Sequence, residues 1–183
     1  RKKLGQNFLI DLNLVRLLVE SAELGPDDVV LEVGTGTGSL TALVAERAAA
    51  VVTVEIDERL FHLAGEELYD LPNVVMLHAD ALQRKNRLNP DVLAAVQEQL
   101  AAGESRCLKL VANLPYQIAT PLVSNLLALD RPPCLMCVTI QKELADRIHA
   151  RPGAKDYGAL SVWVQSQCRV EVVLSLIHIS EPT

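Results

Sequence analysis

A chain of 183 residues is long enough to form one domain with a full hydrophobic core. Half of its residues are hydrophobic and 22% are charged, which is the balance of a soluble globular protein, and no apolar run approaches the roughly 20 residues of a membrane span. The net charge of −6 argues against nucleic-acid binding over the whole surface, although basic residues gather at 1–3, 84–87 and 142–155.

Apolar patterning and capping residues predict alternating helices and strands along the chain. Helices are expected between Asp11 and Gly25, at 39–49, from Asp57 to about Leu68, and at 91–102, 121–129, 142–150 and 158–167. Short apolar strands are expected at 29–34, 51–56, 74–77, 107–112, 134–140 and 169–174. This alternation indicates an α/β fold, with a mostly parallel sheet and helices on both of its faces.

The segment "SLIHISEPT" at 175–183 breaks the alternation of helix and strand. It has the character of a translated adapter or a fusion scar, so we expect it to be a non-native tail. The domain is therefore expected to occupy residues 1–174.

Four cysteines are scattered through apolar stretches, and two of them, Cys134 and Cys137, form a C-x-x-C pattern. That pattern could indicate zinc or redox chemistry. In a strand, however, positions three apart point to opposite faces, so the two thiols are not expected to converge. We expect reduced core cysteines in a cytoplasmic protein, and no metal site.

A glycine-rich turn, "EVGTGTGSLT", joins the first strand to the next helix and contains Gly34, Gly36 and Gly38. Glycines at this place let the backbone approach a ligand, and the helix N-terminus offers free amides. A tight turn without a ligand is one reading, and a nicotinamide dinucleotide site is another. The dinucleotide fingerprint needs its third glycine at position 39, where this chain has Ser39.

Acidic residues also lie at the carboxyl ends of the predicted strands. Glu55 ends the second strand, 21 residues after Gly34, where it can accept hydrogen bonds from both hydroxyls of a ribose. Asp80 ends the third strand, where a carboxylate can meet an adenine amine. Glu32, inside the first strand, is expected to orient the loop rather than touch a ligand. Together these positions favour a site for S-adenosylmethionine at the carboxyl edge of the sheet.

The motif "NLPY" follows the strand at 107–112 and suits methyl transfer to a planar amine. The Asn113 side-chain oxygen and the Leu114 carbonyl can accept the two amine hydrogens, which favours a more nucleophilic nitrogen. Pro115 stiffens the turn, and Tyr116 offers a face on which a base can stack, worth roughly 1–3 kcal/mol. The alternative is an Asn-capped turn with a core tyrosine.

Seven segments in register now give the chain a specific resemblance over residues 1 to about 173. They are "KLGQNFL", "EVGTGTGSLT", "VEID", "HADAL", "NLPYQIATP", "QKELADRI" and "YGALSV". The chain resembles the ribosomal RNA adenine N6-dimethyltransferases that modify small-subunit RNA. The resemblance implies a Rossmann-like class I S-adenosylmethionine-dependent methyltransferase fold. The family's last sheet strand and its small helical C-terminal domain are expected to be absent here.

The resemblance also implies roles for individual residues. Cofactor contacts carry over to Asn7, Leu9, Gly34, Gly36, Glu55, Ile56, Asp80, Ala81 and Asn113. Catalytic positions carry over to Asn113, Leu114 and Tyr116, and contacts with the target base to Phe8 and Tyr116; the basic clusters add expected RNA contacts at Lys2, Lys3 and Arg147. The implied partner is small-subunit ribosomal RNA or the pre-ribosomal small subunit, with no membrane contact, and the protein is expected to be a cytoplasmic monomer.

Two alternatives stay open. One is the related large-subunit RNA methylase that confers macrolide resistance, but that group usually has isoleucine where this chain has Leu114. The other is a factor that binds immature ribosomal subunits or organellar transcription machinery, with methylation secondary. The stretch between Asp80 and Asn113 is longer than in many family members, and its basic start either touches RNA or forms a solvated loop.

Overall fold

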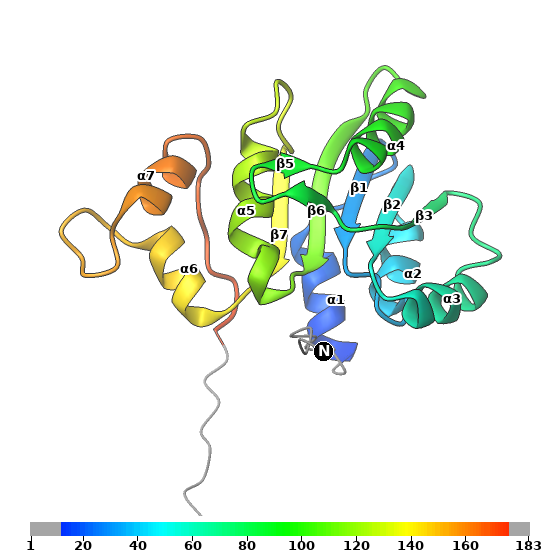
Figure 1. Cartoon of the computed structure of the whole chain (residues 1–183), viewed down its shortest axis with the longest axis horizontal. Helices are drawn as coiled ribbons and strands as arrows, with labels where there is room; N and C mark the ends of the chain where they lie inside the picture. Colours follow the sequence, from blue (N-terminus) through cyan, green and yellow to red (C-terminus); the bar gives the residue numbers. More distant parts are fainter. Residues whose placement is uncertain (1–11, 176–183) are drawn as a thin grey trace, which may run out of the picture. The chain divides into compact units, whose positions relative to one another are not determined.

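The computed structural model describes residues 12–175, in two compact units that divide after Thr139 (Figure 1). The first unit contains a five-stranded sheet in the order β3-β2-β1-β6-β7, and every neighbouring pair in it is parallel. Its strands are β1 (Asp28–Val33), β2 (Ala50–Glu55), β3 (Val74–His78), β6 (Cys107–Asn113) and β7 (Leu135–Thr139). The predicted mostly parallel α/β sheet is therefore confirmed.

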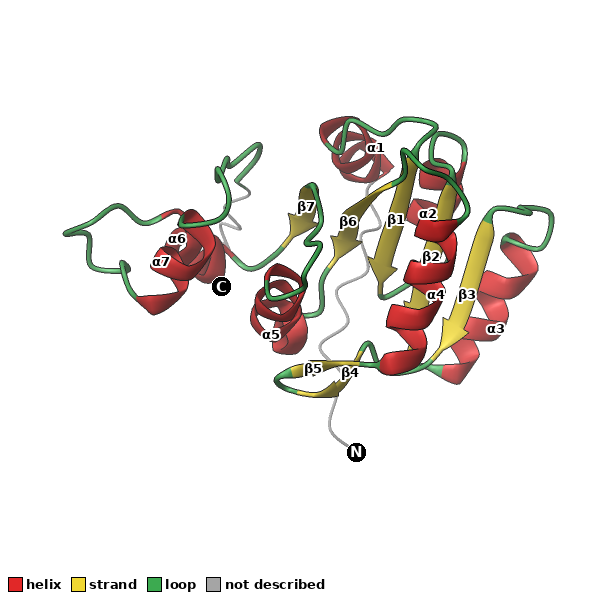
Figure 2. Cartoon of the chain, turned by 90° about the horizontal axis from the view of Figure 1, so that it is seen from above, coloured by secondary structure: helices red, strands yellow, loops and turns green. Residues whose placement is uncertain are grey.

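Helices cover both faces of this sheet (Figure 2). They are α1 (Leu12–Ser21), α2 (Ser39–Ala45), α3 (Glu58–Glu67), α4 (Pro90–Ala101) and α5 (Tyr116–Leu127). α1 and α2 share one core cluster with Val30, Val51 and Val111, which lie on three adjacent strands. Successive side chains of a strand point to opposite faces, and α4 packs against the same three strands through the alternate positions. None of the described helices is long and apolar enough to cross a bilayer.

The strand order places a crevice at the carboxyl ends of β1 and β6. The chain runs outward from β1 to β2 and β3 and then returns to β6, which pairs with the other side of β1. In open α/β sheets such a reversal leaves the loops after the two central strands on opposite sides of a gap, where ligands bind. Here those loops are the glycine-rich turn after Val33 and the "NLPY" segment after Ala112.

Helix α5 begins earlier than the sequence pattern predicts. It starts at Tyr116, directly after Pro115, rather than at Pro121. Pro121 lies inside the helix, and its carbonyl oxygen accepts a hydrogen bond of 2.7 Å from the Asn125 side chain. Tyr116 therefore occupies the first turn of a helix that starts at the sheet edge.

A short antiparallel hairpin, which the sequence pattern did not predict, lies outside the main sheet. It consists of β4 (Leu82–Arg84) and β5 (Arg87–Leu88). Leu82 and Leu88 are paired and buried, while the residues between them are exposed. The polar segment after Asp80 therefore forms a regular β-hairpin.

The second unit contains α6 (Lys142–His149) and α7 (Ala159–Gln165), both as predicted. The Gln165 side chain of α7 donates hydrogen bonds to the carbonyls of Ile148 and Ala150, at 2.7 and 2.9 Å, and so links the two helices. The predicted strand at 169–174 is wrong, because this segment has no regular structure. Its alternating valines fit a strand locally, but a strand also needs a hydrogen-bonded neighbour, and none of the described residues pairs with it.

The expectation of four reduced cysteines is also wrong. Cys107, which begins β6, forms a disulfide with Cys134, just before β7, with their Cα atoms 6.6 Å apart. Because β6 and β7 are parallel neighbours, their first residues lie close together. The two cysteines are 27 residues apart in the sequence, so this proximity could not be predicted from their spacing. Cys137 is free, as expected for a residue on the far side from Cys134, and its thiol lies 3.5 Å from the Leu18 carbonyl.

Removing this disulfide is expected to destabilise the first unit. A cross-link across 27 residues restricts the unfolded chain by about 3 to 4 kcal/mol in the chain-entropy treatment. Urea denaturation of Cys107→Ser/Cys134→Ser should show a lower free energy of unfolding by up to that amount, and reductant should lower the parent similarly. Cys168→Ser, which removes a free thiol, is the control. Equal stability of the double variant and this control would contradict the expectation.

Candidate functional site

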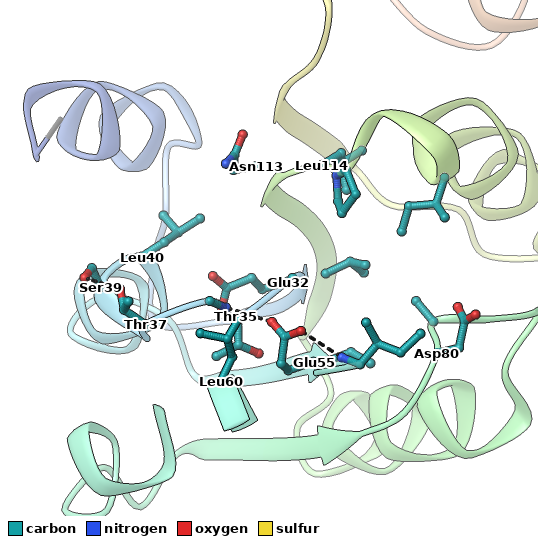
Figure 3. A pocket seen from close by; sticks show the side chains of 18 of the residues that line it. Glu32, Thr35, Thr37, Ser39, Leu40, Glu55, Leu60, Asp80, Asn113 and Leu114 are labelled. Atoms are coloured by element: carbon teal, nitrogen blue, oxygen red, sulfur yellow. Dashed lines mark hydrogen bonds between the residues drawn. The ribbon is translucent and has the colours of Figure 1, made fainter. Parts of the chain in front are cut away.

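A pocket of about 520 Å³ lies at the carboxyl edge of the sheet (Figure 3). This volume is within the range of small-molecule and cofactor sites. Its walls come from the ends of β1, β2 and β6, from the segment after β3, and from the first turns of α1, α2 and α5. The pocket therefore occupies the crevice that the strand order creates.

The glycine-rich turn forms the floor of the pocket. Gly34 and Gly36 have φ values of 90° and 60°, a left-handed backbone that favours glycine. A Cβ atom at Gly34 would lie 3.8 Å from the Asn113 carbonyl oxygen and from the Pro115 ring, so the turn and the "NLPY" segment touch. A Cβ at Gly36 would meet nothing within 4 Å, so the backbone there faces open space in which a ligand can approach.

Glu55 holds the loops around it in place. One carboxylate oxygen accepts the backbone N–H of Gly36 at 2.9 Å, and the other accepts those of Ile56 and Asp57, each at 2.9 Å. The side chain is 3% exposed, so these bonds form away from bulk water. The two N–H groups of Ile56 and Asp57 use both lone-pair positions of one oxygen, and the oxygen that accepts from Gly36 keeps one position for a ligand hydroxyl.

Glu32 lies beneath the turn at the centre of a hydroxyl network. It is buried and accepts hydrogen bonds from Thr41 at 2.5 Å and from Thr53 at 2.8 Å. Thr53 also hydrogen-bonds Thr35, in the turn, at 2.7 Å. Burial raises the pKa of Glu32 from 4.5 to about 7, although the two hydroxyl donors act in the opposite direction. The network ties the turn to β1, β2 and α2.

Replacing Glu32 by Gln is expected to change how stability depends on pH. Between its unfolded pKa near 4.5 and its folded pKa of about 7, Glu32 binds a proton in the folded state that the unfolded state releases. Stability therefore falls as the pH rises through this window, by up to about 3 kcal/mol. Urea denaturation from about pH 5 to about pH 8 should show a flatter profile for Glu32→Gln. The exposed Glu98→Gln is the control, and equal slopes in all three proteins would contradict the assignment.

Asp80 and Ile56 form the far wall of the pocket. Asp80 accepts the backbone N–H of Leu82 at 2.9 Å through one side-chain oxygen, which fixes the direction of its carboxylate. Ile56 is 47% exposed, so it presents apolar surface at the opening, and Ala81, which follows Asp80, is buried. An apolar wall with one carboxylate at its rim can hold a planar heterocycle that carries an amino group.

The "NLPY" segment lies across the pocket from Glu55 (Figure 3). Asn113 ends β6, and its side-chain oxygen accepts a short hydrogen bond from the Thr139 hydroxyl at the end of β7. The backbone N–H of Leu114 donates to the Thr139 carbonyl at 3.1 Å, so the end of one strand holds the end of the other. Leu114 is buried, whereas Tyr116 is 38% exposed.

Comparison with solved structures places this fold among the methyltransferases. A dimethyladenosine transferase from Plasmodium falciparum aligns with a TM-score of 0.70 and 25% identity, over 87% of this chain and 52% of that one. The 23S rRNA methyltransferase ErmE aligns with a TM-score of 0.60 and 31% identity, over 77% of this chain and 50% of that one. The fold is therefore that of the class I methyltransferases.

Sequence comparison decides the family. Residues 1–178 match the family model described as ribosomal RNA adenine dimethylase. The chain belongs to the ribosomal RNA adenine dimethylase family. Curated relatives named ribosomal RNA small subunit methyltransferase A, from Geobacillus kaustophilus and Alkaliphilus metalliredigens, are each 42% identical over 96% of this chain. The chain spans 57 to 58% of the length of these relatives.

The cofactor of this adenine dimethylase family is S-adenosylmethionine, and the pocket has the features to receive it. The open backbone at Gly36 leaves room for close approach, and Glu55 offers buried carboxylate oxygens beside it. Ile56 and Asp80 provide the apolar wall and the acceptor that an adenine needs. The donor set therefore fits the cofactor.

The structure brings together only part of the residue set that the sequence predicts. Gly34, Gly36, Glu55, Ile56, Asp80, Ala81, Asn113 and Leu114 all line one pocket. Tyr116 lies in the first turn of α5, next to the lining residues Pro115 and Gln117. Lys2, Lys3, Asn7, Phe8 and Leu9 lie outside the described residues. Arg147 is exposed on α6 of the second unit.

Several residues of the site escaped the sequence analysis. Leu12, Leu60 and Ile118 add apolar surface to the pocket, and an apolar residue in a helix gives no local sign that it faces a ligand. Thr139 could not be identified from the sequence for a different reason. Its contact with Asn113 depends on the pairing of β7 with β6, and its place near the end of the strand predicted at 134–140 was the only available signal.

Proposed function

We propose that this chain carries the methyltransferase domain of an enzyme that dimethylates the N6 amine of adenosines in small-subunit ribosomal RNA, with a role in ribosome biogenesis. The observation that carries the proposal is the close approach of the glycine-rich turn to the "NLPY" segment. A Cβ atom added at Gly34 would lie 3.8 Å from the Asn113 carbonyl oxygen, so the two segments are close and a donor held by the turn would face the acceptors of "NLPY". The relatives named small subunit methyltransferase A support the choice of RNA.

On the donor side, Glu55 would accept a ribose hydroxyl and Asp80 the adenine amine. When bound, S-adenosylmethionine supplies an electrophilic methyl group, whose bonding electrons stay with sulfur when the group leaves. Because Glu55 already organises Gly36, Ile56 and Asp57, these contacts form without rearranging the loop. The protein's contribution is the geometry, which suits an in-line displacement that depends on near-attack positioning.

On the acceptor side, the Asn113 side-chain oxygen and the Leu114 carbonyl would accept the two hydrogens of the target amine. These bonds would draw the lone pair out of the ring and aim it at the methyl group. As the new N–C bond forms, the nitrogen loses one proton to solvent. The hydrogen bond from the Thr139 hydroxyl fixes the orientation of the Asn113 side chain. A second methyl transfer uses the hydrogen that remains.

Tyr116 would hold the splayed adenine by stacking. It is 38% exposed in the first turn of α5, and Pro115 fixes the backbone before it. An aromatic face contributes roughly 1–3 kcal/mol per stacked base. In this proposal the protein acts as a monomer on the pre-ribosomal small subunit in the cytoplasm.

The test is methyl transfer from methyl-labelled S-adenosylmethionine to separate unmethylated small-subunit and large-subunit RNAs. Label at adenosine N6 in the small-subunit RNA is the expected result. Label confined to the large-subunit RNA would replace the proposal with the alternative that the likeness to ErmE suggests. Tight RNA binding without label on either RNA would instead support a binding factor.

A further inference from the structure

The hairpin of residues 82–88, called here the basic hairpin, gathers three cations and follows directly after the pocket-lining residues Asp80 and Ala81. Arg84, Lys85 and Arg87 lie within four residues and are all exposed, in a chain whose net charge is −6. Within residues 12–175, no acidic side chain forms an ion pair with any of them. The cluster is therefore a local positive surface on an acidic protein.

The pairing within the basic hairpin is electrostatically unfavourable. Arg84 lies opposite Arg87 across the two strands, with a register irregularity between Leu82 and Arg84. Like charges that face each other across strands lower stability. A local conflict of this kind is typical of a functional position, where a ligand of opposite charge offsets the repulsion.

Hydrogen bonds fix the basic hairpin at both ends. At its base, the Asn89 side chain donates to the Asp80 carbonyl at 2.9 Å, and the Asn89 N–H donates to the Ala81 carbonyl at 3.0 Å. At its tip, the Asn125 side chain donates to the Lys85 carbonyl at 3.0 Å. Asp80 and Ala81 line the pocket, so the cations sit on a rigid extension of its wall.

The tip lies beside the helix that begins with Tyr116 (Figure 2). Asn125 is nine residues beyond Tyr116 on α5, which corresponds to about 14 Å along the axis. An RNA strand with a phosphate every 3.4 Å or so covers that length in about four nucleotides. A base that enters the pocket beside Tyr116 would thus have its neighbouring phosphates within reach of the cations.

We infer that the basic hairpin binds the phosphate backbone of the substrate RNA next to the target adenosine. This inference rests on the proposed function for the identity of the RNA. The recognition is electrostatic, because Arg84, Lys85 and Arg87 project from a short hairpin without an aromatic side chain for stacking. The basic hairpin supplies affinity and register, while the pocket selects the base.

The experiment compares Arg84→Gln/Arg87→Gln with Arg16→Gln/Arg47→Gln in the same chain. Arg16 lies on α1 and Arg47 follows α2, so both exposed arginines belong to the helices that cover the face of the sheet opposite to α5 (Figure 2). Each variant loses two charges. Binding to transcribed small-subunit ribosomal RNA is measured over a range of salt concentrations. The slope of log K against log salt should become shallower by about 1.4 to 1.8 only for the hairpin variant.

Two further measurements make the result decisive. Calorimetry with S-adenosylmethionine should give the same affinity for all variants, which confirms an intact pocket, and Arg84→Lys/Arg87→Lys should keep the parent slope. Equal slopes for the hairpin and control variants would overturn the inference, while methyl transfer by the parent would still support the proposed function. A shallower slope for the hairpin variant with no methyl transfer by the parent would support RNA binding by the basic hairpin and reject the proposed function.

Discussion

Asn113→Ala is expected to lower the rate of methyl transfer by about 10²- to 10³-fold, the size of effect seen when one positioned hydrogen-bonding group is removed from an active site. The substitution removes the acceptor that would orient the target amine. Cofactor affinity should change far less, because the turn, Glu55 and Asp80 remain. Single-turnover rates with saturating RNA, together with calorimetry of S-adenosylmethionine binding, separate the two effects.

Thr139→Val is the matched control for Asn113→Ala. It keeps the shape of the Thr139 side chain but removes the hydroxyl that donates to the Asn113 oxygen. A positioning role predicts a smaller loss of rate than in Asn113→Ala, with cofactor affinity unchanged. Equal losses of rate and of cofactor affinity in Asn113→Ala would show that the asparagine supports the fold of the pocket rather than the reacting amine.

Glu55→Ala is expected to weaken S-adenosylmethionine binding by about 10- to 100-fold. A charge-assisted hydrogen bond to the ribose would be lost, at about 1.5–3 kcal/mol. The backbone N–H groups of Gly36, Ile56 and Asp57 would also lose their acceptor. Calorimetry measures the affinity directly.

Glu55→Gln helps to divide this loss into its parts. The amide keeps one oxygen acceptor and the shape of the side chain but loses the charge, so its affinity should lie between those of the parent and Glu55→Ala. Glu98→Ala, on the exposed side of α4, controls for the loss of one negative charge. Unchanged affinity in Glu55→Ala would remove Glu55 from the cofactor site.

The central part of the fold could be predicted because its signals are local. The apolar runs that became β1, β2 and β6 are short, buried and bounded by turn residues or caps, as Asp57 shows by accepting two backbone N–H groups at the start of α3. The positions of Gly34, Glu55, Asp80 and Asn113 followed from one rule, that parallel strands end at one edge. Their convergence in one pocket agrees with that rule.

The remaining features depend on contacts between distant segments. The Cys107–Cys134 disulfide and the Thr139–Asn113 hydrogen bond both require the pairing of β6 with β7. The strand expected at 169–174 had suitable residues but no neighbouring strand among the described residues. The start of α5 was misplaced because Pro121 is a good first residue for a helix, while Pro115 provides the actual start.

The backbone hydrogen bonds that hold Glu55 in place before a ligand binds have a consequence for inhibition by the reaction product. Glu55 and Asp80 would bind the ribose and the adenine, the parts of the cofactor that methyl transfer leaves unchanged. The demethylated product, S-adenosylhomocysteine, would therefore keep these contacts and lose only those made to the methyl group and the sulfur charge. Such uniform binding holds donor and product almost equally well, so turnover would slow as product accumulates. In the cell, the rate of RNA modification would then follow the ratio of the two molecules rather than the amount of donor alone.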